Sequence, residues 1–160
     1  MRIVRVIKVL MTLGLIAAGA GYALTMPKTV PASALPARTA TIANGETMFN
    51  IGGCASCHAT PEKKDRTLLG GGHELKTDFG IFRVPNISSD KTHGMGGWTE
   101  AEFVTAMQKG TGRKGEHLYP AFPYSSYQRM KLDDVRDLYA FMKTLPADPT
   151  PSKPHDLKFP

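Results

Sequence analysis

The pattern of apolar and polar positions predicts a chain made mainly of helices, with little sign of strands. In residues 132–146, LDDVRDLYAFMKTLP, apolar side chains recur at helical spacing, so this segment is predicted to be an amphipathic helix. A second helix is predicted over residues 98–110, WTEAEFVTAMQKG, and a third over residues 41–52, TIANGETMFNIG. Residues 124–130 are expected to add a short helix.

Local signals indicate where these helices begin and end. Thr99 and Glu102 form a Thr-x-x-Glu capping box ahead of the second helix, and Gly110 is a natural stop for it. Pro146 is expected to end the last helix. Residues 59–98 are predicted to be a long loop, and loops of that length in small domains usually have a functional role.

The N-terminus carries a basic stretch followed by an apolar one. Arg2, Arg5 and Lys8 precede the uncharged residues 9–26, which just reach the length that can span a bilayer. A secretory signal peptide and an uncleaved anchor both fit this pattern, and the length favours the anchor. Because the basic residues keep the N-terminus cytoplasmic, the rest of the chain is expected on the periplasmic side of a bacterial inner membrane.

Composition divides the remaining chain. Residues 1–26 are the signal-anchor or signal peptide, and residues 27–40 are a Pro/Ala-rich linker that is expected to be an unpacked spacer. Residues 41–147 form one domain, and residues 148–160 form a Pro-rich tail that is expected to run over the surface. The net charge of +6 comes partly from the N-terminal basic residues. Acids and bases nearly balance within the domain, so a nucleic-acid partner is not expected.

Both cysteines of the chain, Cys54 and Cys57, lie in one motif, CASCH, which ends at His58. A Cys-x-x-Cys pair can be a redox dithiol, half of a zinc site, or the attachment point of a c-type haem. Zinc would need further thiolate or paired histidine ligands, and a thioredoxin-like dithiol would need flanking strands of a βαβ unit. Only the haem interpretation uses all three residues. It predicts one covalent haem c, with two thioethers and His58 as the proximal iron ligand.

A haem iron in an electron carrier needs a sixth ligand, and methionine favours the ferrous state. The candidates after the motif are Met95, Met107, Met130 and Met142. Met107 and Met142 fall on apolar helix faces, where core packing explains them. Met95 lies among glycines and could line a haem crevice, whereas Met130 lies in a loop without a predicted core role. Loop histidines could serve instead: His73, His93 and His117.

Several strings resemble a known family. The sequences GGCASCH, PNISSD, GMGGWTEAEF and LYPAFPYSSYQRM are similar to one haem module of the cytochrome c subunits of bacterial membrane-bound dehydrogenases, which act on alcohol, gluconate, sorbose or fructose. The resemblance covers residues 41–147. It implies a class I-like, all-α cytochrome c fold with His/Met ligation, and by position it implies Met130 as the distal ligand.

The chain also departs from that family. The well-known subunits carry three such modules and attach to the membrane at the C-terminus, whereas this chain has one motif and an N-terminal apolar segment. Some members have AMPY where this chain has AFPY, and Phe122 cannot bind iron.

Together these features predict an electron carrier and not an enzyme. It would accept electrons from a periplasmic dehydrogenase and pass them to a quinone-linked complex, another cytochrome or a terminal oxidase. Loop 59–98 would wrap one haem edge, with four pocket or propionate partners: Arg83, Trp98, Tyr119 and Tyr124. The alternative is a haem sensor or small haem enzyme with an open sixth position.

Overall fold

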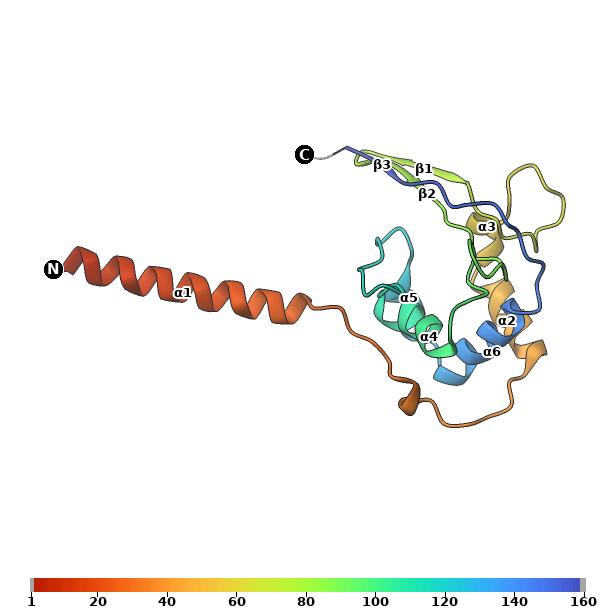
Figure 1. Cartoon of the computed structure of the whole chain (residues 1–160), viewed down its shortest axis with the longest axis horizontal. Coiled ribbons are helices and arrows are strands. Elements are labelled where there is room, and N and C mark those ends of the chain that lie inside the picture. The colour runs from red at the N-terminus through yellow and green to blue at the C-terminus, as the bar shows by residue number, and fades with distance from the viewer. Residues whose placement is uncertain (1, 159–160) are drawn as a thin grey trace.

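The computed structural model describes residues 2–158 and separates one long helix from a small domain (Figure 1). Helix α1 (Arg2–Thr25) has 24 residues, all of them exposed, and extends away from the rest of the chain. Its length and apolar composition would allow it to cross a membrane, and a signal sequence near an N-terminus has the same properties. At about 1.5 Å per residue it is about 36 Å long, against about 30 Å for a bilayer's hydrocarbon core.

The segment after α1 lies against the domain and is not the unpacked spacer that its composition suggested. It contains one turn of 3-10 helix, η1 (Ala32–Ala34). The backbone N–H of Val30 donates to Thr105 Oγ1 at 2.9 Å, and Arg136 donates to the carbonyl of Pro36 at 2.8 Å. Val30 and Leu35 pack on the hydrophobic core. The composition did not reveal this packing because the contacts come from residues that are distant in sequence.

Helices α2 (Ile42–Ile51) and α6 (Leu132–Met142) pack closely against each other, and both were predicted from the sequence. Gly45 allows the approach, because a Cβ atom there would lie 2.6 Å from the Cβ of Phe141 and would overlap the carbonyl of Asp137. The rings of Phe49 and Phe141 lie 5.5 Å apart across the same contact.

Helix α4 (Glu100–Lys109) packs near α6 and shows the predicted end signals. The Thr99 hydroxyl accepts a hydrogen bond from the N–H of Glu102, and the Glu102 carboxylate accepts one from the N–H of Thr99. Gly110 follows in the left-handed conformation, with φ 63°. Helix α5 (Tyr124–Tyr127) is the short helix expected in this region.

The core is formed by side chains from α2, α4, α6 and the loops between them. Met107 and Met142 are both buried, as their positions on apolar helix faces predicted. The buried apolar cluster contains Phe49, Leu69, Met95, Phe103, Val104, Met107, Val135, Leu138, Met142 and Leu145.

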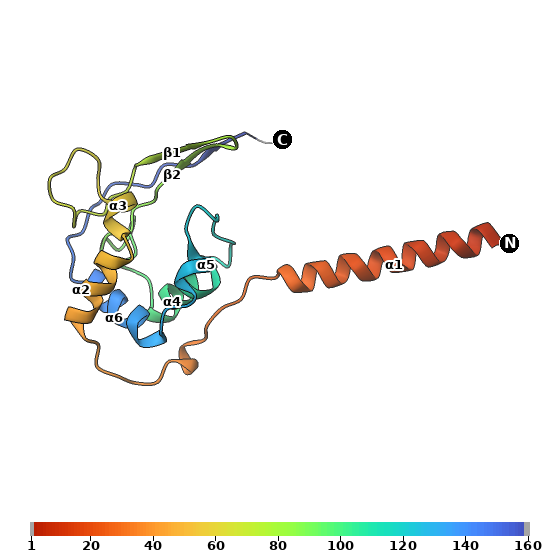
Figure 2. The ribbon, with the colours of Figure 1, turned by 180° about the vertical axis from the view of Figure 1, so that it is seen from behind.

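The all-α expectation holds only in part, since the domain is mainly helical but also has a small antiparallel sheet. Strand β1 (Glu74–Thr77) pairs with β2 (Gly80–Arg83), and β2 pairs with β3 (Asp156–Leu157) from the C-terminal tail. Figure 2 shows the sheet beside the helical part, at the end of the domain where α3 lies. Strands this short carry too few alternating positions to be detected from sequence, and β3 depends on pairing with a distant segment.

The part of loop 59–98 that follows β2 is hydrogen-bonded to the segment after α6. Buried Asn86 donates from its amide to the carbonyls of Asp148 and Thr150, at 2.7 and 2.8 Å. Ser89 donates to the carbonyl of Leu145 at 2.6 Å. The PNISSD string therefore has a structural role, because it ties the loop to the segment that follows α6.

Candidate functional site

The CASCH motif forms a helix of its own, α3 (Cys54–His58), directly after α2. Gly53 precedes it in the left-handed conformation, with φ 67°, and this turns the chain between the two helices. Glycine suits that position because a side chain would be strained there. Cys54 and Cys57 are three positions apart, which brings them to one face of the helix.

The imidazole of His58 is held by a backbone carbonyl. Its Nδ1 lies 2.9 Å from the carbonyl oxygen of Pro85, and because a carbonyl can only accept, Nδ1 carries the proton. The lone pair of the neutral ring is then on Nε2. Burial lowers the pKa of His58, more than the Pro85 carbonyl raises it, so the ring is neutral at pH 7. A neutral imidazole with a fixed tautomer can act as a metal ligand.

The glycine run at residues 70–72 brings this carbonyl into place. The N–H of Gly71 donates to the carbonyl of His58 at 3.0 Å, and the N–H of Gly72 donates to that of Val84 at 2.8 Å. A Cβ atom on Gly71 would lie 2.5 Å from the carbonyl oxygen of Pro85. The glycines therefore allow the loop to run between α3 and the Pro85 segment, and His58 is bonded through both its backbone and its ring.

Two further side chains support the motif and were not found from the sequence. Arg66 donates to the carbonyl of Ala55 at 2.6 Å, and Tyr127 donates to the carbonyl of Gly52 at 2.8 Å. Burial raises the pKa of Tyr127, and the nearby thiols of Cys54 and Cys57 raise it further. Tyr127 lies within LYPAFPYSSYQRM, one of the strings that carry the family resemblance, whereas Arg66 lies in a charged loop without such a signal.

The two thiols differ in their surroundings. Cys54 is partly buried against the core, and burial raises the pKa of its thiol to about 11. Cys57 is exposed. The surroundings of Cys54 are apolar and favour an uncharged sulfur, as the sulfur of a thioether would be. With an imidazole whose Nε2 is unprotonated, this donor set fits a covalently attached haem c.

Met130 follows α5 and is half-buried. With five neighbours it lines a small hollow beside the start of the motif: Met48, Ile51, Gly52, Ser126 and Tyr127. Met95, by contrast, is buried in the core. Of the candidate methionines, Met130 is the one whose side chain the core does not enclose.

The other predicted pocket residues are divided among separate places. Arg83 lies in β2, where it contacts Glu74 at 3.0 Å and donates to the carbonyl of Pro154 at 2.8 Å. Tyr119 packs edge-on against Phe82, with ring centroids 5.1 Å apart. These two residues lie together at the sheet.

Trp98 and Tyr124 lie nearer the helices. The carbonyl of Trp98 accepts a hydrogen bond from the Tyr139 hydroxyl at 2.8 Å, and its side chain packs on the core. The ring of Tyr124 lies over Gly110, where a Cβ atom would come within 2.7 Å of it.

A helix that presents two thiols and a carbonyl-held imidazole, within a small helical domain, defines a c-type haem protein. A family model for cytochrome c matches residues 42–146. The chain belongs to the cytochrome c family, and covalent haem c and the class of electron carrier, as opposed to enzyme, follow from that membership.

The relatives agree with the resemblance found in the sequence. A diheme c-type cytochrome of Cereibacter sphaeroides is 47% identical over 152 residues, which cover 94% of this chain and 51% of that protein. The fructose dehydrogenase cytochrome subunit of Gluconobacter japonicus is 35% identical over 152 residues, covering 94% and 30%. The gluconate 2-dehydrogenase cytochrome c subunit of Pantoea cypripedii is 34% identical over 105 residues, covering 66% and 23%. This chain thus spans about half, or less, of the length of these relatives.

Proposed function

We propose that this chain is a one-haem electron carrier of the periplasmic respiratory chain, with His58 and Met130 as iron ligands. The observation that carries the proposal is helix α3, which combines both cysteines with an imidazole fixed by the Pro85 carbonyl. A haem bound there would supply a centre that accepts and releases one electron at a time. Cys54 and Cys57 would hold it by thioethers, and His58 would offer Nε2 to its iron.

The surrounding residues would keep that ligand set constant. The Pro85 carbonyl fixes the tautomer and direction of the His58 ring, and such a hydrogen bond also raises the basicity of the ligand. Tyr127 ties α5 to the end of α2. This would hold Met130 close to the attachment helix. Met95, Met107 and Met142 are buried among core side chains, whereas Met130 lines a hollow beside the motif, and this difference supports Met130 as the distal ligand. Arg83, Trp98, Tyr119 and Tyr124 stay predictions as haem-pocket partners.

The names of the relatives support the proposed electron donor. Two of these are cytochrome subunits of dehydrogenases, so the electron donor would be a periplasmic dehydrogenase. The acceptor would be a quinone-linked complex, another cytochrome or a terminal oxidase.

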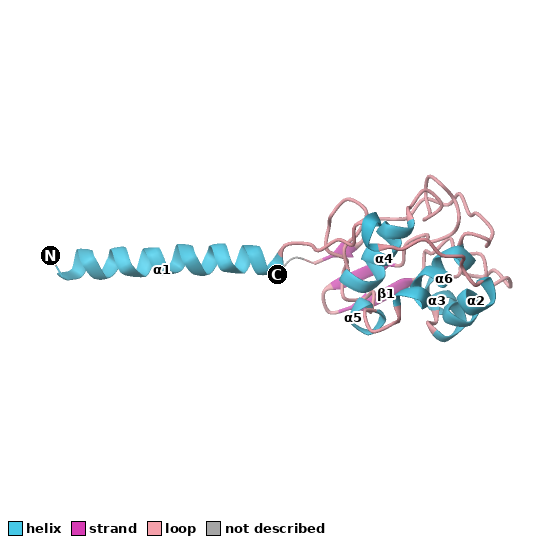
Figure 3. Ribbon diagram, turned by 90° about the horizontal axis from the view of Figure 1, so that it is seen from below, coloured by secondary structure: helices cyan, strands magenta, loops and turns pink. Residues whose placement is uncertain are grey.

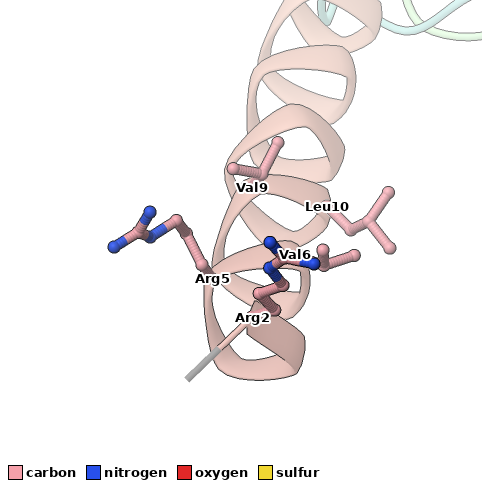
Figure 4. Close-up of a pocket in the computed structure, with 5 residues that line it drawn as sticks. All are labelled: Arg2, Arg5, Val6, Val9 and Leu10. Carbon is pink, nitrogen blue, oxygen red and sulfur yellow. The ribbon is translucent and has the colours of Figure 1, made fainter.

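Helix α1 would anchor the protein to the inner membrane. Figure 4 shows Arg2 and Arg5 projecting from its first turns beside Val6, Val9 and Leu10. Cations at the N-terminal end of α1 favour a cytoplasmic N-terminus. The domain at the other end of the helix would then lie in the periplasm.

The test compares Met130→Ala with Met107→Leu in the purified holoprotein. Met130→Ala should keep the covalent haem and lose the weak red absorption band of ferric iron bonded to methionine. It should also bind carbon monoxide and show a lower reduction potential, because the ferrous state loses a soft donor. Met107→Leu is a near volume-conserving core change and should alter none of these properties.

Two results would count against the proposal. If Met130→Ala keeps the band and potential, Met130 is not the ligand. If the wild-type ferric haem is high-spin and five-coordinate, the sixth position is open, and a sensor or small haem enzyme fits better than a carrier.

A further inference from the structure

The end of α1 is attached to one particular place on the domain. His117 Nε2 lies 2.7 Å from the carbonyl oxygen of Thr25, the last residue of the helix. Five residues later, the Val30 N–H is bonded to Thr105 in α4. These contacts leave little slack between the helix and the domain, so they fix which side of the domain faces a membrane that contains α1.

The β1–β2 hairpin reaches toward that same side. Figures 1 and 2 show its tip and β3 pointing toward the side of the domain that α1 joins, at some distance from the helix itself. Figure 3, seen at a right angle, shows the strands on the side of the domain nearest α1. The helices α2, α3 and α6 lie farther away from α1 in each of these views.

The tip of the hairpin carries an aromatic ring that is exposed to solvent. Phe79 is 70% exposed, although its backbone is well bonded. Its carbonyl accepts from the N–H of Lys158 at 2.8 Å, and its N–H donates to Thr77 Oγ1 at 3.2 Å. The turn therefore holds the backbone rigidly and leaves the ring in solvent. The exposed charges near this tip are mixed: Lys76 in β1 and Lys158 beside β3 are cations, and Asp78 in the turn and Asp156 in β3 are anions.

We propose that Phe79 enters the interface of the membrane that holds α1 and so forms a second lipid contact for the domain. The inference rests on the anchoring role proposed for α1. Aromatic rings favour the headgroup region, and lysines beside such a ring can extend their amines to lipid phosphates. A lipid surface is favoured over a protein partner because the hairpin, whose turn contains Phe79, points toward the side of the domain that α1 joins.

This second contact has a consequence for electron transfer. A domain held at both α1 and the hairpin tip cannot roll freely on the membrane. Helix α3 would then keep one orientation, with the thioether residues Cys54 and Cys57 at a constant distance from the lipid surface. A membrane-bound donor would meet the domain in the same pose at each encounter.

The experiment places a bimane label at Phe79→Cys or, as the control, at Lys64→Cys in the loop that follows α3. Both variants use the full-length holoprotein, whose native cysteines are consumed by the haem. The proteins are reconstituted into vesicles of phosphatidylcholine and phosphatidylglycerol, with and without doxyl-labelled phosphatidylcholine. Unchanged Soret and circular dichroism spectra establish that the labelled proteins are folded.

The label at position 79 should be quenched several-fold more strongly by the doxyl lipid than the label at position 64. If the protein floats with the vesicles and the two labels are quenched equally, the tip contact is wrong and the anchor stands. In that case the exposed ring is available to a protein partner. If the protein does not float with the vesicles, both the anchor and the tip contact are wrong.

Discussion

Asp137 is buried in α6. Its carboxylate accepts the hydrogen bonds that attach the segment around the start of α2 to the domain. Its Oδ1 accepts from Arg38 Nη1 at 2.6 Å and from the N–H of Thr41 at 2.8 Å. Its Oδ2 accepts from Asn44 Nδ2 at 2.9 Å. Replacing it with asparagine keeps the shape but removes the charge and puts an NH₂ group where one oxygen accepts. At least one of these donors must then lose its partner.

The size of the effect follows from the pKa of Asp137. Burial would raise that pKa, but the hydrogen bonds from Arg38, Thr41 and Asn44 outweigh it and lower the value from 3.8 to about 2. At about 1.4 kcal/mol for each pKa unit, this difference corresponds to roughly 2 kcal/mol of folding free energy. Because the folded pKa is depressed, this contribution is complete above about pH 4 and is lost as the pH falls toward about 2.

The assay is denaturant unfolding of the holoprotein in detergent, followed by far-ultraviolet circular dichroism from neutral to acidic pH. Asp137→Asn should lower the free energy of unfolding by roughly 2 kcal/mol at pH 7, and the gap from wild type should close on acidification. Haem ligands also titrate in acid, but both proteins share them, so they cancel in the comparison.

The matched control is Asp133→Asn in the same helix. Asp133 also faces Arg38, at 3.4 Å, but its side chain is 69% exposed, so its loss should cost well under about 1 kcal/mol. If Asp137→Asn costs no more than Asp133→Asn, or if its gap from wild type does not change with pH, the reasoning about the buried carboxylate is wrong.

Two further substitutions test the packing and the helix ends. Gly45→Ala should lower the free energy of unfolding of the domain by more than about 1 kcal/mol, since its Cβ would lie 2.6 Å from the Cβ of Phe141. Gly19→Ala in α1 meets no neighbour and should leave that free energy unchanged, so equal values for the two variants would contradict the close helix contact. Thr99→Ala should cost about 1 kcal/mol in the same unfolding experiment, because the N–H of Glu102 loses its capping oxygen, and Thr99→Ser should restore most of the loss.

The sequence predicted the features that depend on local patterns. The helical periodicity around Val135 and Leu138, the capping box at Thr99 and the stop at Gly110 each involve residues within a few positions of one another. The CASCH motif likewise carries its chemistry within five residues, and the family match agrees with it.

The features that were missed depend on contacts between distant segments. The carbonyl of Pro85 has no side-chain signature, although it fixes the ring of His58 across 27 positions. Strand β3 exists only because the tail returns to β2. The docking of the linker likewise depends on Arg136 reaching the Pro36 carbonyl, and neither residue indicates the other in the sequence.

The close packing of α2 against α6 brings the first and last helices of the family match together. A domain whose entry and exit are adjacent can be joined in tandem to a similar one without disturbing either interior. Such a module is suited to gene duplication, since a second copy needs only a connecting segment. The diheme relative, of which this chain spans 51%, has the length that a second module would require.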